Sequence, residues 1–165
     1  MHPNVAALDA ALAQARTPTV REFLAFMRAI QPADRLPPRA AFDPAALPGL
    51  LANVVLVEVV REEPGAVPRF FVRVAGQTVL EATDDIKMNR YLDETLGTPA
   101  NIAPHDARRA VVETGCLQFR HGPPRVSFKL DYIETVEFAH CPLADDGRDV
   151  DRIVSVLDYG KHHRR

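Results

Sequence analysis

The sequence has no tryptophan, only two cysteines and no apolar run of the length that a bilayer-spanning helix needs. Its N-terminus also lacks a basic start followed by an apolar stretch, which is the pattern of a secretory leader. Because of these absences we expect a cytoplasmic protein in which Cys116 and Cys141 stay reduced. No membrane partner is expected.

An excess of positive charge is missing as well. The chain has 20 Lys and Arg against 22 Asp and Glu, a formal net charge of −2. Domains that bind nucleic acid are usually basic, so no nucleic-acid partner is expected. The one cationic cluster is the tail 161–165, which we interpret as a frayed, solubilising end. The length of 165 residues favours a single domain.

Motifs of catalysis and metal binding are also absent. The sequence contains no Gly-x-Ser-x-Gly, no His-Glu-x-x-His and no phosphate-binding glycine loop. The histidines and cysteines do not cluster as a structural zinc site requires, so no metal is expected. The sequence does not identify a cofactor. Haem held by one histidine is an alternative that singles out no residue, whereas the segment 115–119 lacks the flanking residues of a flavin-linked cysteine motif.

Two helices are predicted at the N-terminus. The first covers residues 4–16 and has a thin apolar stripe, which we expect to serve as a dimer or partner surface and which consists of Val5, Leu8 and Leu12. Thr17 and Pro18 fit the N-cap and the first position of a second helix that ends near residue 30. Its strong amphipathic spacing predicts one buried face.

Five strands are predicted after a proline-rich loop. Residues 53–60 and 70–75 read as a hairpin, and the first of these strands is apolar enough to be covered on both faces. A mixed helical segment follows, with a helix over 106–114 that ends at Gly115. The last three strands are expected at residues 116–120, 125–140 and 151–159.

The long strand carries the clearest pattern. Its even-numbered residues from Val126 to Phe138 are mostly apolar and its odd-numbered residues mostly polar, which predicts one buried face and one wet face. The last strand alternates much less, which favours a central position in the sheet. Together the elements predict an α+β fold with an antiparallel sheet. The central helical segment would cover one face, and an N-terminal helix part of the other.

This order of elements resembles that of a PAS domain, and the residues resemble a PAS-like family of short stand-alone proteins common in alphaproteobacteria. The likeness runs over roughly 20–159, and four segments carry it: Leu36-Pro37-Pro38-Arg39 through Leu50-Leu51, Phe70 to Gly76, Asp85 with Arg90 to Glu94, and Pro142 to Ile153. The sequence departs from the family at Thr83-Asp84 and Asn89, where glycines are usual.

The resemblance implies a PAS fold: a five-stranded antiparallel sheet that cradles a small cavity, with helices on one face. The expected organisation is an N-terminal helical extension at 1–31, the PAS-like domain at 32–160 and the basic tail at 161–165. PAS domains of this kind are sensors or dimerisation modules and are normally not enzymes. The implied partners are an unknown small ligand and either a second copy of the chain or a signalling protein.

A candidate pocket can be assembled from the predicted strands. Its apolar and aromatic walls would be Phe71, Tyr91, Phe128, Leu130 and Tyr132. Glu134 falls in register with the apolar face of the long strand, so we expect it to be buried and paired with Arg73. The alternative is that a bulge turns Glu134 outward or that the end of the strand is simply exposed. For the aromatic residues, the alternative is a plain packed core.

Three functions remain open at this point. The first is a non-enzymatic sensory domain that binds a small ligand or a protein partner. The second is a cone-shaped α+β enzyme in which Glu134 and a histidine act as an acid–base pair in a sheet-lined pocket. The third is a PAS scaffold without a ligand that serves only dimerisation.

Overall fold

A computed structural model describes residues 1–95, 103–124 and 133–161. These residues form an α+β fold around one antiparallel sheet of five strands in the order β2-β1-β5-β4-β3. The strands are β1 (Val54–Val60), β2 (Arg69–Ala75), β3 (Gln118–Gly122), β4 (Ile133–Leu143) and β5 (Arg152–Lys161). The predicted hairpin and the predicted central position of the last strand are both confirmed.

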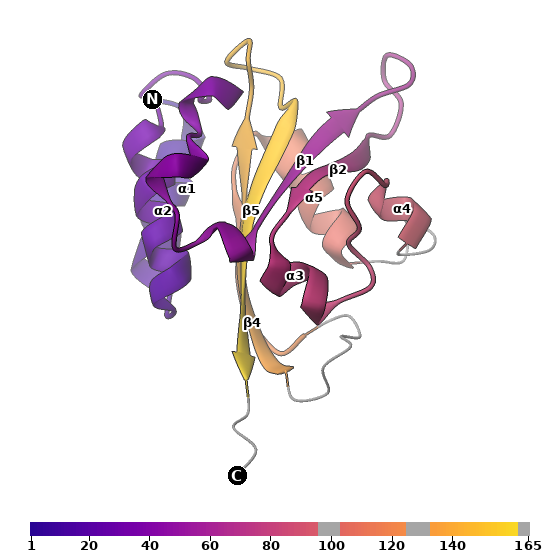
Figure 1. Cartoon of the computed structure of the whole chain (residues 1–165). Coiled ribbons are helices and arrows are strands. Elements are labelled where there is room, and N and C mark those ends of the chain that lie inside the picture. The colour runs from indigo at the N-terminus through magenta and orange to yellow at the C-terminus, as the bar shows by residue number, and fades with distance from the viewer. Residues whose placement is uncertain (96–102, 125–132, 162–165) are drawn as a thin grey trace.

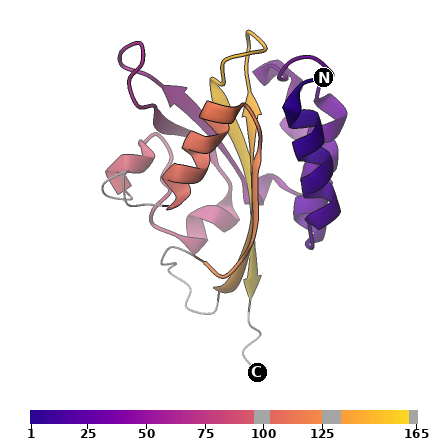
Figure 2. The same ribbon diagram turned by 180° about the vertical axis from the view of Figure 1, so that it is seen from behind.

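Helices cover both faces of the sheet (Figure 1). One face carries α1 (Pro3–Gln14) and α2 (Pro18–Ile30), and the other carries α3 (Gln77–Ala82), α4 (Leu92–Thr95) and α5 (Ala103–Thr114). The view from behind shows α5 lying along the sheet (Figure 2). Three short 3-10 turns lie between α2 and β1, at Arg39–Ala41, Pro44–Ala46 and Leu51–Asn53. None of the helices in the described ranges could cross a membrane.

Two separate hydrophobic cores result from this layering. The core between the sheet and α1–α2 contains Phe23, Leu24 and Met27 of α2 together with Val154 and Val156 of β5. The core on the other face is built from strand residues whose side chains point away from α1 and α2. It includes Val55, Val57, Phe70, Val72, Ile153, Leu157 and Tyr159. Since strand residues alternate between faces, each central strand must be apolar on both sides.

The chain enters α2 as its sequence predicts. The Oγ1 atom of Thr17 accepts a hydrogen bond from the amide of Val20, and Pro18 occupies the first helical position. The Thr17 hydroxyl satisfies an amide that has no partner inside the helix, and Pro18 has no N–H group that would need one. The buried stripe of α2 then packs on the sheet.

The apolar stripe of α1 does not lie on the surface of the molecule. Val5 is 3% exposed and Leu8 is 1% exposed, and Leu8 packs in the core that α1 and α2 share with the sheet. Leu12 is half-buried against the same core. The predicted dimer or partner surface is therefore wrong for Val5 and Leu8, because both side chains are already buried within one chain.

Asn4 attaches the start of α1 to two distant segments. Its Nδ2 donates to Oε1 of Gln31 over 2.9 Å, and its Oδ1 accepts from the amide of Leu117 over 2.8 Å. Asn4 is buried, so both of its polar atoms need such partners. These bonds hold α1 against the end of α2 and the segment that precedes β3.

The described part of the predicted long strand, β4, departs from its predicted pattern. Val136 is buried toward α5, as expected, but Glu137, Ala139 and Cys141 are buried on the opposite face. The predicted wet face is wrong because α1 and α2 lie over it. Residues 125–132, which include Val126, Phe128, Leu130 and Tyr132, lie outside the described residues.

The loop between α3 and α4 runs along the outer edge of β2. The amide of Asn89 donates to the carbonyl of Val72 over 2.8 Å, and the amide of Val72 donates to the carbonyl of Arg90 over 2.9 Å. Asn89 has a φ of 60°, in the left-handed region that glycine and asparagine tolerate best. Asn89 therefore adopts a backbone conformation that glycine favours.

Candidate functional site

The predicted pocket residues of β2 lie at the edge of the sheet. Phe71 and Tyr91 do meet, with ring centroids 5.1 Å apart in an edge-to-face arrangement. Phe71 lies between two residues of the core under α3–α5, Phe70 and Val72, so alternation places its ring on the opposite face. Arg73 is 54% exposed and its Nε donates to Oε1 of Glu58 over 2.8 Å.

The expected Arg73–Glu134 pair is wrong. Arg73 belongs to β2 and Glu134 to β4, and two strands separate them in the sheet. The pairing of β4 with β5 shifts register between Ile133 and Thr135, and Glu134 is exposed there. Glu134 therefore points outward near the start of β4, as the alternative of a bulge or an exposed strand end expects. The other pocket candidates, Phe128, Leu130 and Tyr132, lie outside the described residues.

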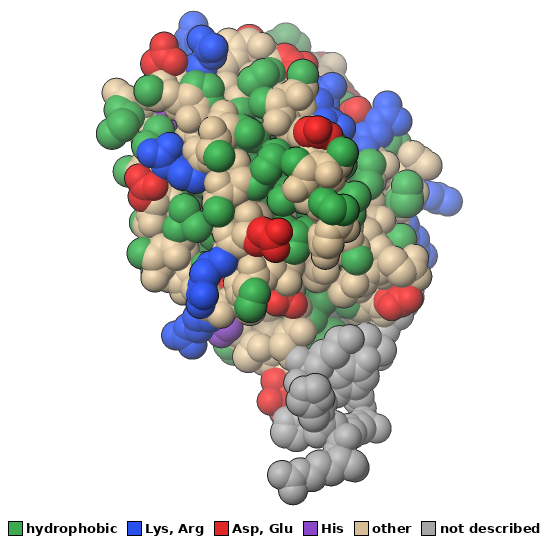
Figure 3. All heavy atoms as spheres, turned by 60° about the vertical axis from the view of Figure 1, so that its left-hand side comes forward, with side chains coloured by type: hydrophobic (Ala, Val, Ile, Leu, Met, Phe, Trp, Pro, Cys, Tyr) green, Lys and Arg blue, Asp and Glu red, His purple; other side chains and the backbone are tan. Residues whose placement is uncertain are grey.

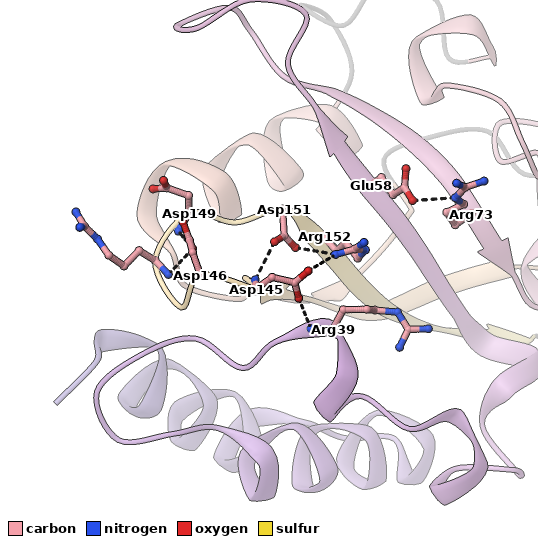
Figure 4. Close-up of polar contacts among 9 residues, drawn as sticks. Arg39, Glu58, Arg73, Asp145, Asp146, Asp149, Asp151 and Arg152 are labelled. Atoms are coloured by element: carbon pink, nitrogen blue, oxygen red, sulfur yellow. Dashed lines mark hydrogen bonds and ion pairs between the residues drawn. The ribbon is translucent and has the colours of Figure 1, made fainter.

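The surface polar contacts form a network rather than a site (Figure 4). Arg152 contacts Asp145 over 3.1 Å and Asp151 over 3.3 Å, and the amide of Arg39 donates to Asp145 over 3.0 Å. Exposed ion pairs of this kind contribute little free energy. The face that carries α1 and α2 shows charged side chains of both signs scattered among hydrophobic ones (Figure 3).

The most unusual chemistry lies under α5. His105, Arg108 and Val111 recur at a spacing of three residues, and all three side chains face the core; the exposed fractions are 1%, 1% and 0%. That spacing puts them on one face of a helix. A histidine and an arginine therefore occupy positions where an amphipathic helix normally has apolar residues.

The sheet contributes three polar side chains to the same layer. Nδ1 of His140 on β4 lies 2.6 Å from Oγ of Ser155 on β5, its direct neighbour across the two strands. The His140 ring also stacks on Phe138 with centroids 4.5 Å apart. Tyr159 lies on the same face of β5 as Ser155. We call these five residues the polar core cluster: His105, Arg108, His140, Ser155 and Tyr159.

Arg108 provides the charge of the polar core cluster. Burial lowers the pKa of its guanidinium to about 10, so Arg108 remains protonated at neutral pH. Burial, followed by the positive charge of Arg108, lowers the pKa of His105 and lowers that of His140 well below its ordinary value. Burial raises the pKa of Tyr159. The cluster thus holds one cation among two neutral imidazoles and a neutral phenol.

His105 is the member whose hydrogen bonds are not made. Both of its ring nitrogens are buried, and neither has a hydrogen-bond partner within the described ranges. Its ring lies beside Phe70, with centroids 6.0 Å apart. An unmet buried polar group costs roughly 1–3 kcal/mol. Native proteins carry few such groups, so each one needs a specific explanation.

Within the described residues there is no group of three or more His, Cys, Asp or Glu side chains that could hold a metal ion. The polar core cluster contains a guanidinium, a phenol and a serine hydroxyl, and each of its neutral imidazoles has one N–H donor and one acceptor nitrogen.

A second buried charge lies on the opposite face of β4. Glu137 accepts hydrogen bonds from the amide of Arg16 at 2.9 Å, the amide of Thr17 at 3.0 Å and Oγ1 of Thr17 at 2.9 Å, and Nδ1 of His121 lies at 2.8 Å. Although burial acts to raise it, these bonds lower the pKa of Glu137. We call this set the Glu137 junction contact, because it holds the α1–α2 junction to the sheet.

The acid–base hypothesis placed Glu134 in a pocket beside a histidine. Glu134 is exposed, and among the described contacts a histidine lies beside Glu137. All of the contacts that Glu137 makes are accounted for by backbone, hydroxyl and imidazole groups of its own chain. These contacts indicate a structural role for Glu137, which holds the α1–α2 junction to the sheet.

Sequence reasoning missed His105 and Arg108. The signal was present, because the two residues share a helical stripe with Val111 and Val112. The helix was expected only from residue 106 onward, which left His105 outside it. Comparison with family models, with curated proteins and with solved structures finds no match for this chain.

Proposed function

We propose that this chain is a non-enzymatic, PAS-like sensory domain that binds a small ligand at the polar core cluster. The order of elements supports the PAS-like fold: two strands, a helical segment and three strands, with N-terminal helices on the far face. The left-handed backbone of Asn89 also supports it, since a glycine is usual at that position in the family.

The observation that carries the proposal is His105. An apolar side chain at this position would pack beside Phe70 without any unmet polar group. A buried histidine without hydrogen-bond partners lowers stability, and such costs are typical of functional sites. A ligand that pairs with the ring nitrogens would remove the cost when it binds.

The first experiment is native mass spectrometry of the purified full chain, with the melting temperature measured in parallel. We expect a retained small molecule that is released on denaturation. His105→Phe should bind the molecule more weakly yet unfold at a higher free energy, by roughly 1–3 kcal/mol, because the unmet polar group is gone. Glu113→Gln on the exposed side of α5 is the matched control and should change neither property.

The opposite result has a clear meaning. If the wild-type chain shows only its own mass, and His105→Phe is less stable than the wild type, then His105 is part of an ordinary core. The chain would then be a scaffold without a ligand, and the sensory proposal would be withdrawn.

A further inference from the structure

We infer that α1 is a releasable strap. The helix leaves the rest of the molecule in an opening that precedes global unfolding, and polar contacts at its two ends hold it in the docked position. The opening is a movement of the fold and does not depend on the proposed ligand. The distribution of contacts along α1 is what points to it.

The apolar attachment of α1 is thin. Its buried apolar side chains are Val5, Leu8 and Ala11, and only Leu8 among them is large. In the middle of the helix, Asp9 forms an exposed ion pair with Arg28 of α2 over 2.8 Å, and exposed ion pairs contribute little free energy. A helix of 12 residues is marginal in water by itself, so α1 depends on its contacts to stay folded and docked.

The neighbouring helix α2 is attached much more strongly. It buries Phe23, Leu24 and Met27 in the same core, and each of these side chains is 2% exposed or less. The free energy of burial grows with the apolar area that is removed from water. Loss of α2 would open the core above the sheet, whereas loss of α1 exposes one leucine and several smaller side chains. The opening of α1 alone is therefore the less costly of the two.

Polar contacts at the two ends of α1 compensate for its thin stripe. At the start, Asn4 bonds to Gln31 over 2.9 Å and to the amide of Leu117 over 2.8 Å. At the end, the Glu137 junction contact holds the two residues that lead into α2. Water can replace these bonds when the helix leaves, so they fix the docked position at a moderate net free energy.

Release of the strap changes what the surface presents. In the docked helix Val5 is 3% exposed and Leu8 is 1% exposed, so neither side chain is accessible. In the released state the same stripe is uncovered. Any molecule that binds the released state better than the docked state shifts the equilibrium toward release, which makes the strap a two-state device.

The test is native-state hydrogen exchange of the full-length wild-type chain, followed by mass spectrometry at low urea concentrations. The probes are the amides of residues 7–14 in α1, 22–30 in α2 and 154–157 in β5. We expect the amides of α1 to exchange about tenfold or more faster than those of α2 and β5, with a weaker dependence on urea because less surface is exposed. Equal rates with equal urea dependence would overturn the inference, since α1 would then open only with the whole domain.

Substitutions connect the opening to the two ends of the helix. Glu137→Gln should raise the exchange rate of α1 about a hundredfold over the matched control Glu134→Gln, and Asn4→Ala should raise it about tenfold. Should Glu137→Gln fail to fold, Asn4→Ala carries the comparison.

A substitution in the other core shows whether α1 opens separately. Val57 is fully buried on the face opposite α1, and it keeps its contacts when α1 alone opens. Val57→Ala should therefore accelerate exchange in β5 and leave the exchange of α1 unchanged. If Val57→Ala accelerates α1 and β5 by the same factor, α1 is not a separate unit and the inference is wrong.

Discussion

Replacing Glu137 by glutamine should detach the α1–α2 junction from the sheet. The carboxylate accepts hydrogen bonds at both oxygens, from two backbone amides, one hydroxyl and one imidazole. A glutamine has the same shape but only one acceptor oxygen, and its NH₂ group would face donors. At least two of the bonds are lost, and the amides of Arg16 and Thr17 compete for the remaining oxygen.

The size of the effect follows from the type of bond. A hydrogen bond to a charged group contributes roughly 1.5–3 kcal/mol, so the loss of two predicts a destabilisation of about 3–5 kcal/mol at pH 7. The matched control is Glu134→Gln, three residues earlier in the same strand. Because Glu134 is exposed, its replacement should change the free energy of unfolding by no more than about 1 kcal/mol.

The dependence on pH gives an independent check. The pKa of Glu137 is lowered in the folded protein, so its contribution is complete above the ordinary carboxylate value of about 4.3 and is lost as the pH falls toward the folded value. Protonation makes the wild-type side chain resemble glutamine. The difference between wild type and Glu137→Gln should therefore shrink between pH 6 and pH 3.

The assay is urea unfolding followed by far-ultraviolet circular dichroism at several pH values. Two results would refute the reasoning. One is a cost below about 1 kcal/mol at pH 7, which would mean that the junction does not depend on the charge. The other is a cost that is the same at pH 6 and pH 3.

Three further predictions concern other parts of the molecule. A Cβ at Gly76 would overlap the backbone of Leu51 and Ala52, so Gly76→Ala should lower the free energy of unfolding by about 2 kcal/mol or more. Gly49 has open space around it, so the control Gly49→Ala should not lower it. Equal denaturation midpoints for the two variants would contradict this prediction. Leu8→Ala should cost about 2–5 kcal/mol and leave the mass in solution unchanged, whereas a change of oligomeric state without a loss of stability would restore α1 as an interface. Burial and the charge of Arg108 lower the pKa of His140 in the folded protein. The contribution of neutral His140 to stability is therefore complete above about pH 6.5 and is lost as the pH falls below that value. The plot of unfolding free energy against pH between 7 and 5 should be flatter for His140→Gln, and an unchanged slope would mean that His140 does not cause it.

Local signals in the sequence predicted most of the fold. Thr17 and Pro18 begin α2 because their chemistry is specific for a helix start, and Gly115 ends α5 with a φ of 66°. The weak alternation of the last strand correctly placed β5 at the centre of the sheet. Each of these inferences needs only the residue and its near neighbours in the chain.

The candidate site could not be predicted in the same way, because it depends on what covers each face. Alternation in β4 indicated a wet side, yet that side is buried because α1 and α2 pack on it. A register shift near the start of β4 then left Glu134 exposed and not on the buried face that its number implied. The stripe of α1 was interpreted as a partner surface because a sequence does not reveal whether the partner of an apolar stripe belongs to the same chain.

The two buried charges of this fold call for different explanations, and their hydrogen bonds show which is which. Glu137 holds the α1–α2 junction with every contact supplied by the chain, so stability alone accounts for its presence. On the opposite side of the sheet, the ring nitrogens of His105 in α5 meet no partner among the described residues, although the charge of Arg108 acts on the ring and Phe70 lies beside it. The unmet ring nitrogens of His105 lower stability, whereas the bonds of Glu137 add to it. This contrast is the reason why we propose the polar core cluster, and not the Glu137 junction contact, as the ligand site.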